Sequence, residues 1–348
     1  MWTKRSMGNL AQTQKKNLEI QPDHISQLLL DNYWELMYEF YEMQTTFLSK
    51  RYKIHKCIQS ANIIISLIKN VHLSIVRQRE KKLDFIISLD NFWDNFKKIE
   101  KPTNKIVSIV SITGIPKETV RRKIKKLIKN QFIKSDTENS RQYFWNLTLK
   151  RKDNFLEVMD SDIKAMSRFI NKITKNLNLN LTQKNIQDEI KDQFSFYFYH
   201  FLDCQLKWLR MWQIKIKDVD LIFIAMQALI PTLRYGDKKI NLNNLGIDNI
   251  NTIVGQTNNQ YKNSNKSISA ASVSDVTGIP RATCARKLEK LSKLGFLIKD
   301  NETRRYYVNQ FTESRTKNII TKDNIRFTIN CFSEYLSIIA NALIRNKN

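Results

Sequence analysis

The stretch TGIPKETVRRKIKKLIKNQFI, Thr113 to Ile133, has a near copy, TGIPRATCARKLEKLSKLGFL, from Thr277 to Leu297. At a fixed offset of 164 residues and without gaps, segments 110–148 and 274–312 share 16 identical residues in 39 positions. Self-similarity of this extent is the signature of a duplicated structural unit. The chain is therefore interpreted as two related units.

Each copy predicts the same order of elements. A short apolar segment ends at Thr-Gly, where glycine suits a turn with positive φ, and proline follows at the expected first position of a helix. An apolar stripe at helical spacing runs through each predicted helix: Val120, Ile124 and Leu127, then Cys284, Leu288 and Leu291. The expected elements are helices 116–130 and 280–294, strands 132–133 and 142–145 in the first copy, and strands 296–298 and 306–308 in the second. A helix, a turn, a helix and a hairpin form a winged helix-turn-helix.

The shared pattern TGIPxxTxxRKxxKLxKxxF, followed by a charged hairpin with arginine and tyrosine, resembles a known group of domains. It looks like the winged helix-turn-helix of bacterial transcription regulators, especially the MarR-like and IclR-like types. The resemblance covers less than a quarter of the chain. It implies DNA binding by both copies, an amphipathic helix before each motif, and pairing of the two units as in a homodimer.

The rest of the sequence predicts mostly helix. The expected helices are 25–50, 57–78, 82–96, 162–177, 188–212, 219–233 and 318–345, and the Asn-rich segment 241–267 is expected to be a mobile loop. A division near residue 180 gives two domains, 1–180 with a motif at about 105–148 and 181–348 with a motif at about 268–312. The expected fold class is mainly α with small β-hairpin wings, in which two winged helix-turn-helix units form a helical, pseudo-twofold internal dimer.

The composition favours a polyanionic partner. Lys plus Arg number 58 against 33 Asp plus Glu, which gives a formal net charge of +25 and a pI near 9.8. Double-stranded DNA is the first candidate and an anionic membrane surface the second. The polar N-terminus does not resemble a signal peptide, and the apolar runs are too short to cross a bilayer. Four widely spaced cysteines suggest neither a disulfide framework nor a zinc site. We therefore expect a cytoplasmic protein that has no cofactor or metal and does not bind a membrane.

The helix after each turn is the expected recognition helix, whose N-terminal half enters the major groove. The predicted DNA-contacting residues are Lys117, Thr119, Arg121, Arg122, Lys125, Arg281, Thr283 and Arg286, with Arg141, Arg304 and Arg305 in the wings. We assign the shared threonines to a phosphate or base-edge contact and the shared arginines to phosphate or guanine. The wing arginines are expected to reach the adjacent minor groove or the DNA backbone.

The two predicted recognition helices differ at three outward positions. Glu118, Arg121 and Lys125 of the first copy correspond to Ala282, Ala285 and Glu289 of the second. A homodimer must present identical helices to DNA, whereas a fused pair is free to diverge. We therefore expect a two-part, imperfectly symmetric DNA site in which the first unit holds phosphates more strongly.

Several alternatives remain open. The aromatic segment 194–212 could line a pocket for an unknown small-molecule effector, but packing between helices is the favoured interpretation. No Gly-rich phosphate loop, GxSxG or HExxH motif appears, so nothing indicates an enzyme. We expect a sequence-specific transcription regulator. The alternatives are a plasmid- or phage-type replication initiator with two winged helices, or a winged-helix protein-interaction module.

Overall fold

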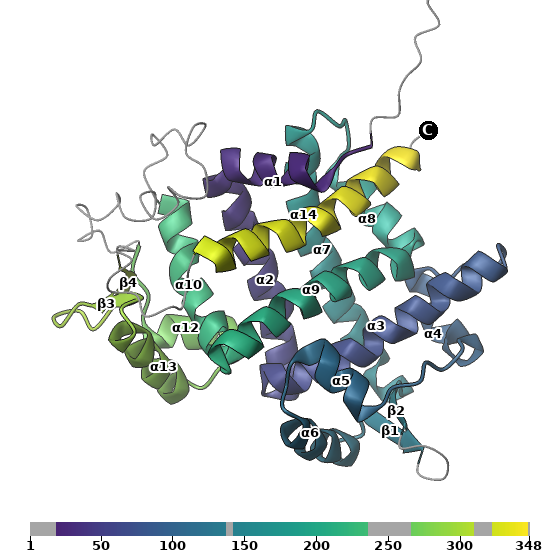
Figure 1. Ribbon diagram of the computed structural model, residues 1–348, viewed down its shortest axis with the longest axis horizontal. Helices are drawn as coiled ribbons and strands as arrows, with labels where there is room; N and C mark the ends of the chain where they lie inside the picture. The colour runs from purple at the N-terminus through teal and green to yellow at the C-terminus, as the bar shows by residue number, and fades with distance from the viewer. Residues whose placement is uncertain (1–18, 137–141, 236–265, 310–321, 347–348) are drawn as a thin grey trace, which may run out of the picture.

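The computed structural model describes residues 19–136, 142–235, 266–309 and 322–346 (Figure 1). They are mainly helical and include two antiparallel strand pairs, which confirms the expected mainly-α class with small hairpins. The first half contains α1 (Pro22–Asp31), α2 (Tyr33–His55), α3 (Ile58–Lys81), α4 (Leu89–Asn95), η1 (Phe96–Lys98), α5 (Ile106–Thr113), α6 (Lys117–Lys129), β1 (Ile133–Asp136), β2 (Gln142–Trp145), η2 (Leu149–Arg151) and α7 (Lys152–Asn176). The second half contains α8 (Gln183–Asp192), α9 (Phe194–Ile216), α10 (Val219–Tyr235), α12 (Ala270–Thr277), α13 (Arg281–Lys293), β3 (Leu297–Lys299), β4 (Tyr306–Val308) and α14 (Lys322–Arg345).

The duplication extends well beyond the quoted motif. Helices α1 and α8 have 10 residues each, α2 and α9 have 23 each, and both pairs begin 161 residues apart. Helices α5 and α12, with 8 residues each, and α6 and α13, with 13 each, begin 164 residues apart. The left-handed residue after α2, Lys56 at φ 55°, has its counterpart after α9 in Lys217 at φ 59°. We call residues 22–176 repeat 1 and residues 183–345 repeat 2.

The two repeats interlock through reciprocal packing. Helix α2 packs against α10, while its counterpart α9 packs against α3, the counterpart of α10. In the same way α1 packs against α14, and its counterpart α8 packs against α7. Figure 1 shows α3, α9 and α14 running side by side across the molecule. One hydrophobic core therefore crosses the expected domain boundary near residue 180.

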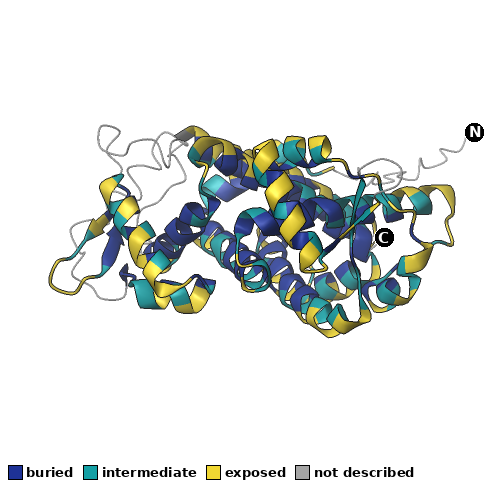
Figure 2. Cartoon of the chain, turned by 90° about the horizontal axis from the view of Figure 1, so that it is seen from below, coloured by how far each residue is buried: buried dark blue, intermediate teal, exposed yellow. Residues whose placement is uncertain are grey.

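Aromatic side chains of α9 lie at the centre of this core. Phe194, Tyr197, Phe198 and Phe201 are each at most 1% exposed. Figure 2 shows buried residues concentrated between the helices and exposed residues along their outer faces. The aromatic segment 194–212 therefore packs between helices, in agreement with the favoured interpretation.

Two expected helices are interrupted in the structure. The helix expected over 25–50 breaks at Asn32, whose side-chain amide donates to Leu28 O at 3.2 Å and so competes with the helical backbone. The helix expected over 188–212 breaks at Gln193, which adopts φ −101° and ψ 37° between α8 and α9. Both breaks occur at equivalent places in the repeats and let a short helix turn away from a long one.

The helix expected over 82–96 was wrong in its first half. Only α4 is helical there, followed by the single turn η1. Ser88 starts α4 by accepting a hydrogen bond from Asn91 N at 3.4 Å, while Asn91 Oδ1 accepts one from Ser88 N at 3.0 Å. This capping box marks a helix start at Leu89, seven residues later than expected.

Three other expectations concern segment bounds. Helix α7 begins at Lys152, earlier than the expected residue 162, and α14 is described from Lys322 onward. The Asn-rich segment 241–267 lies outside the described residues except for Lys266 and Ser267.

Within the described residues, one helical stretch, Asp323–Arg345, is long and apolar enough to cross a membrane. Of its most apolar window, 61% is buried inside the protein, and α14 packs against α1 and α9. Helix α14 is therefore packed as part of the helical core.

Candidate nucleic-acid interface

The repeated threonine holds the turn between the two helices of each motif. Thr113 Oγ1 donates to Ile109 O at 2.7 Å and accepts from Ile115 N at 3.3 Å. Thr277 makes the same two bonds in repeat 2, at 2.6 and 3.2 Å. The hydroxyl thus satisfies a carbonyl of the first helix and an amide of the turn, which explains why threonine recurs.

The repeated glycine has both a conformational and a packing role. Gly114 and Gly278 end their helices in the left-handed region, at φ 68° and 75°. A Cβ on Gly114 would lie 3.2 Å from Cγ of Arg210 and from Cγ1 of Ile214, both on α9. A Cβ on Gly278 would lie 2.9 Å from Cγ of Lys53 on α2. Each turn is therefore pressed against the long helix of the other repeat.

The repeated proline lies one position earlier than expected. Pro116 and Pro280 are N-caps with ψ 141° and 136°, and the helices begin at Lys117 and Arg281. The extended ψ angles exclude the prolines from the first helical position. Their fixed φ and missing N–H still suit a residue that makes no intrahelical donation.

Helix α6 buries its apolar stripe and exposes its basic face. Val120, Ile124 and Leu127 are at most 3% exposed. The predicted contact residues lie on the opposite side: Lys117, Arg121, Arg122 and Lys125 are exposed, and Thr119 is partly exposed. The structure therefore brings the predicted residues of the first unit together on one solvent-facing surface.

One of these side chains has an internal partner. Arg121 Nη1 lies 2.7 Å from Glu118 Oε1, three residues earlier on the same helix face. Within the described part of the chain, Arg122 and Lys125 form no ion pair or side-chain hydrogen bond. The cationic groups of Arg122 and Lys125 therefore remain available to a ligand.

A hollow of about 730 Å³ runs beside this basic face. Arg121, Arg122 and Lys125 of α6 line it together with Tyr143 of β2 and Ile106 of α5. The side of α6 that faces the hairpin is thus concave, basic and bordered by an aromatic ring.

Helix α13 carries fewer charges than α6. Arg281 and Arg286 are exposed and Thr283 is partly exposed. Lys299 Nζ and Tyr306 Oη donate to Glu289 Oε2 at 3.0 and 3.1 Å. These bonds lower the pKa of Glu289. The only acidic residue of α13 is therefore ionised and bound to the hairpin.

Lysines shared by both copies anchor α6 and α13 to the other helices, a role that the sequence did not reveal. Lys123 Nζ donates to Cys57 Sγ at 3.0 Å, at the turn between α2 and α3. Its counterpart Lys287 donates to Asp218 Oδ1 at 2.5 Å, at the equivalent turn between α9 and α10. The available signal was their identity in both repeats, next to the exposed Arg122 and Arg286.

The wing of repeat 2 is one residue shorter than the ungapped alignment assumes. Ile133 pairs with Trp145 in the first hairpin, whereas its counterpart Leu297 pairs with Val308 in the second. The structural offset in the second strand is therefore 163. This register also reveals the equivalent Asn146 and Asn309, whose side-chain amides donate to backbone carbonyls at 2.7 and 2.9 Å.

This register changes the alignment of the wing arginines. The ungapped alignment pairs Arg141 with Arg305, and this pairing was wrong, because the strand register makes Arg305 the counterpart of Gln142. Arg305 is partly buried and donates to Ser267 Oγ at 2.6 Å, which ties the wing to the segment before α12. Arg304 is exposed with φ 55°, and Arg141 lies outside the described residues.

Each hairpin is joined to the chain segment that precedes its helix-turn-helix. Tyr143 N donates to Asn104 O at 2.9 Å, and the counterpart Tyr306 N donates to Ile268 O at 2.8 Å. These equivalent bonds tie each hairpin to the segment just before α5 or α12.

Comparison with protein-family models and with curated proteins finds no match.

Proposed function

We propose that the protein is a cytoplasmic, sequence-specific transcription regulator that binds double-stranded DNA through one winged helix-turn-helix unit in each repeat. The observation that supports this most is the matched pair Arg122 and Arg286. They occupy equivalent positions on α6 and α13 and are exposed, and their side chains form no hydrogen bond or ion pair within the described segments. An arginine on the outer face of a recognition helix can bind guanine or phosphate with two parallel hydrogen bonds.

The net charge of +25 supports a strong electrostatic component of binding. A protein that neutralises several phosphates releases counterions from DNA, so its affinity falls steeply as salt rises. The reciprocal packing of the repeats supports a pseudo-twofold internal dimer. In such a dimer the two units address two parts of one site.

The two parts of the site are proposed to be unequal. Helix α6 contains seven Lys or Arg and one Glu, whereas α13 contains five and one. The first unit is therefore expected to hold phosphates more strongly. Ala282 and Ala285 replace charged residues on α13, and short apolar side chains can contact thymine methyl groups.

The proposal is tested by selecting bound duplexes from a random-sequence pool and measuring their affinity by fluorescence anisotropy. Affinity is expected to fall by orders of magnitude between about 50 and 200 mM salt. Arg122→Ala and Arg286→Ala should each cost about 1–3 kcal/mol. Lys184→Ala changes an exposed lysine of α8 and is the matched control, which should bind as the unchanged protein does.

Two results would contradict DNA recognition by these helices. One is an affinity for DNA that does not change with salt concentration, and the other is an equal loss of affinity in Lys184→Ala and Arg122→Ala. A strictly palindromic site with equal losses at both arginines would contradict only the unequal division. Mapping the bound sites in the genome distinguishes the roles, since a regulator binds near promoters and an initiator binds clustered repeats at an origin.

A further inference from the structure

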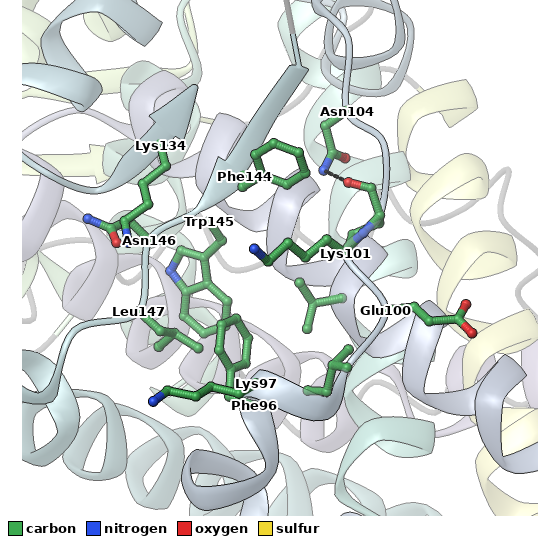
Figure 3. Close-up of a pocket in the computed structure, with 13 residues that line it drawn as sticks. Phe96, Lys97, Glu100, Lys101, Asn104, Lys134, Phe144, Trp145, Asn146 and Leu147 are labelled. Carbon is green, nitrogen blue, oxygen red and sulfur yellow. Dashed lines mark hydrogen bonds between the residues drawn. The ribbon is translucent and has the colours of Figure 1, made fainter. Parts of the chain in front are cut away.

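Three lysines of repeat 1 gather beside its hairpin, outside the two helices α5 and α6. Lys97 and Lys101 belong to the segment 96–104 that precedes α5, and Lys134 belongs to β1. All three line one hollow between that segment and the hairpin, and Figure 3 shows them around it. We call these three residues the lysine cluster.

The charge of the lysine cluster is not neutralised by the protein. All three side chains are exposed, and none forms an ion pair or a side-chain hydrogen bond within the described ranges. The one carboxylate that lines the hollow belongs to Glu100, which points away from Lys97 and Lys134 in Figure 3. Three uncompensated amines on one surface favour a polyanionic ligand.

The segment that carries two of these lysines is held in place by hydrogen bonds. Asn104 is 2% exposed; its Oδ1 accepts from Asn70 Nδ2 at 2.6 Å, and its carbonyl accepts from Tyr143 N at 2.9 Å. Near the other end, Glu100 N donates to Gln78 Oε1 at 3.0 Å. The segment is thus joined to α3 and to the hairpin, so a ligand would not have to order it.

The lysine cluster lies on the face of the hairpin that points away from α6. Lys134 pairs with Phe144 across the two strands, so their side chains share one face, and Phe144 lines the same hollow as the lysine cluster. The preceding residue, Tyr143, lines the hollow beside the basic face of α6. Successive side chains of a strand point to opposite faces. A polyanion that follows the basic face of α6 past the hairpin therefore meets the lysine cluster next.

Repeat 2 has no equivalent of this cluster in its sequence. The strand register makes Ile298 the counterpart of Lys134, and Ile298 is 45% exposed. The offset of 164 also holds just before the helices, because the carbonyls of residues 104 and 268 accept equivalent bonds from the two hairpins. At this offset the other two lysines correspond to Tyr261 and Asn265. All three lysines are therefore matched by neutral residues.

We propose that the lysine cluster binds the phosphates of duplex DNA that continues past the hairpin of repeat 1, outside the part of the site that α6 contacts. This inference rests on the proposed function and adds a third contact region to it. Duplex DNA carries one negative charge per roughly 1.7 Å of its axis, so a few more base pairs bring several phosphates beside the three amines. A lysine binds phosphate as a point charge and carries no sequence information. The bound DNA is therefore longer on the side of repeat 1, whatever the sequence of the added part.

The test measures the affinity of the full chain for three duplexes by fluorescence anisotropy. One is the minimal selected site, and the other two are lengthened at one end or at the other by about ten base pairs, roughly one helical turn. One extension is expected to tighten binding about tenfold and to steepen the slope of log affinity against log salt by up to about 3, because each phosphate contact contributes about 0.9. The other extension should change the affinity by less than about twofold.

A pair of double variants assigns this gain to the lysine cluster. Lys101→Ala with Lys134→Ala should remove most of the gain and lower the salt slope on the longer duplex by about 2. The matched control is Lys175→Ala with Lys184→Ala, which removes two exposed lysines at the end of α7 and the start of α8. Lys175 lies about 35 Å along α7 from the hairpin, so the control should keep the whole gain. All four changes are at exposed side chains, so the thermal unfolding of both variants should match that of the unchanged protein.

Four results would overturn the inference: no gain from either extension, equal gains from both, a gain that survives Lys101→Ala with Lys134→Ala, or an equal loss of the gain in the control. The third result would assign the lysine cluster to another polyanion, such as an acidic protein surface, and the fourth would show that net charge alone acts. The proposed function is judged separately, on the minimal site. A chain that does not bind the minimal site refutes DNA recognition, whereas one that binds it without regard to flanking DNA refutes only the role of the lysine cluster.

Discussion

Phe47 of α2 packs edge to face on Phe201 of α9, with ring centroids 5.1 Å apart. Phe201 and Trp208 lie 161 residues after Phe40 and Phe47, and Phe40 packs on Trp208 with centroids 6.1 Å apart. The second contact is therefore the first with the repeats exchanged. Contacts that survive such an exchange characterise an isologous interface, here between two parts of one chain.

The interlocked core predicts that neither half folds alone. A fragment of residues 1–180 loses the partners of α1, α2 and α3, and so exposes the apolar faces that α14, α10 and α9 cover. We expect it to aggregate or self-associate in sedimentation velocity, and to give a cooperative thermal transition with native near-ultraviolet dichroism only after refolding with residues 181–348. A folded monomer of residues 1–180 would contradict this interpretation of the core.

Gly278→Ala should destabilise the protein by about 1–3 kcal/mol in urea unfolding, because φ 75° is strained for alanine and the new methyl meets Lys53 Cγ. In the double variant Lys53→Ala with Gly278→Ala, the loss of stability caused by the contact with Lys53 should disappear, and the loss caused by the strained φ should remain. If Gly278→Ala destabilises the protein equally with and without Lys53→Ala, the turn of repeat 2 does not press on α2.

Two histidines, the buried His72 and the partly buried His55, predict a loss of stability in mild acid. Burial lowers the pKa of His72 to about 3, and burial together with nearby arginines lowers that of His55 to about 3. In the unfolded chain both titrate near 6.5, so below that pH the unfolded state binds more protons than the folded state. Stability is therefore present above about pH 6.5 and lost as pH falls, by up to about 1.4 kcal/mol per pH unit for each histidine.

The measurement is the free energy of unfolding in urea between about pH 7 and 5.5, where most carboxylates remain ionised in both states. His72→Leu lowers stability at every pH, but its informative effect is on the slope of stability against pH, which should become shallower. An unchanged slope would show that His72 is not held neutral in the folded protein.

The cysteines predict a selective reaction with thiol reagents. Cys57 is partly exposed, whereas Cys204, Cys284 and Cys331 are buried, and burial raises the pKa of the Cys204 and Cys284 thiols. A disulfide reagent such as DTNB should modify one thiol rapidly in the native protein and the other three only on unfolding. Cys57→Ser should abolish the rapid phase. Rapid modification of two or more thiols in the native protein would contradict the burial of the other three cysteines.

The similarity of the long helices shows why the extent of the duplication was not predicted. Aligned at 161 residues, α2 and α9 share only four of 23 residues, namely Tyr38/Tyr199, Phe40/Phe201, Gln44/Gln205 and Leu48/Leu209. The helices are related by length, capping and packing partners more than by residue identity. A core tolerates many apolar exchanges if volume and pattern are kept, so sequence similarity fades there first.

The two hairpins show a different limit of prediction from sequence. The ungapped alignment counts Arg141 and Arg305 as an identical pair. The strand register shows instead that Arg305 is structurally equivalent to Gln142. A single-residue difference in a turn shifts a strand by one position and turns each side chain to the other face. Only hydrogen-bonded register reveals that shift, and with it the equivalence of Asn146 and Asn309.

The sequence by itself determined the repeated motif, because its interactions are local: a threonine hydroxyl reaching four residues back, a glycine at positive φ, a proline before a helix and an apolar stripe at helical spacing. The basic face of α6 follows from the same stripe, since the residues between its apolar positions must point outward. Only the tertiary structure decided that α2 packs on α10 and α9 on α3, that Lys123 and Lys287 turn inward, and that a pocket forms under one wing. Those features join residues distant in the chain, and hydrophobic periodicity specifies which face of a helix is buried but not which partner covers it.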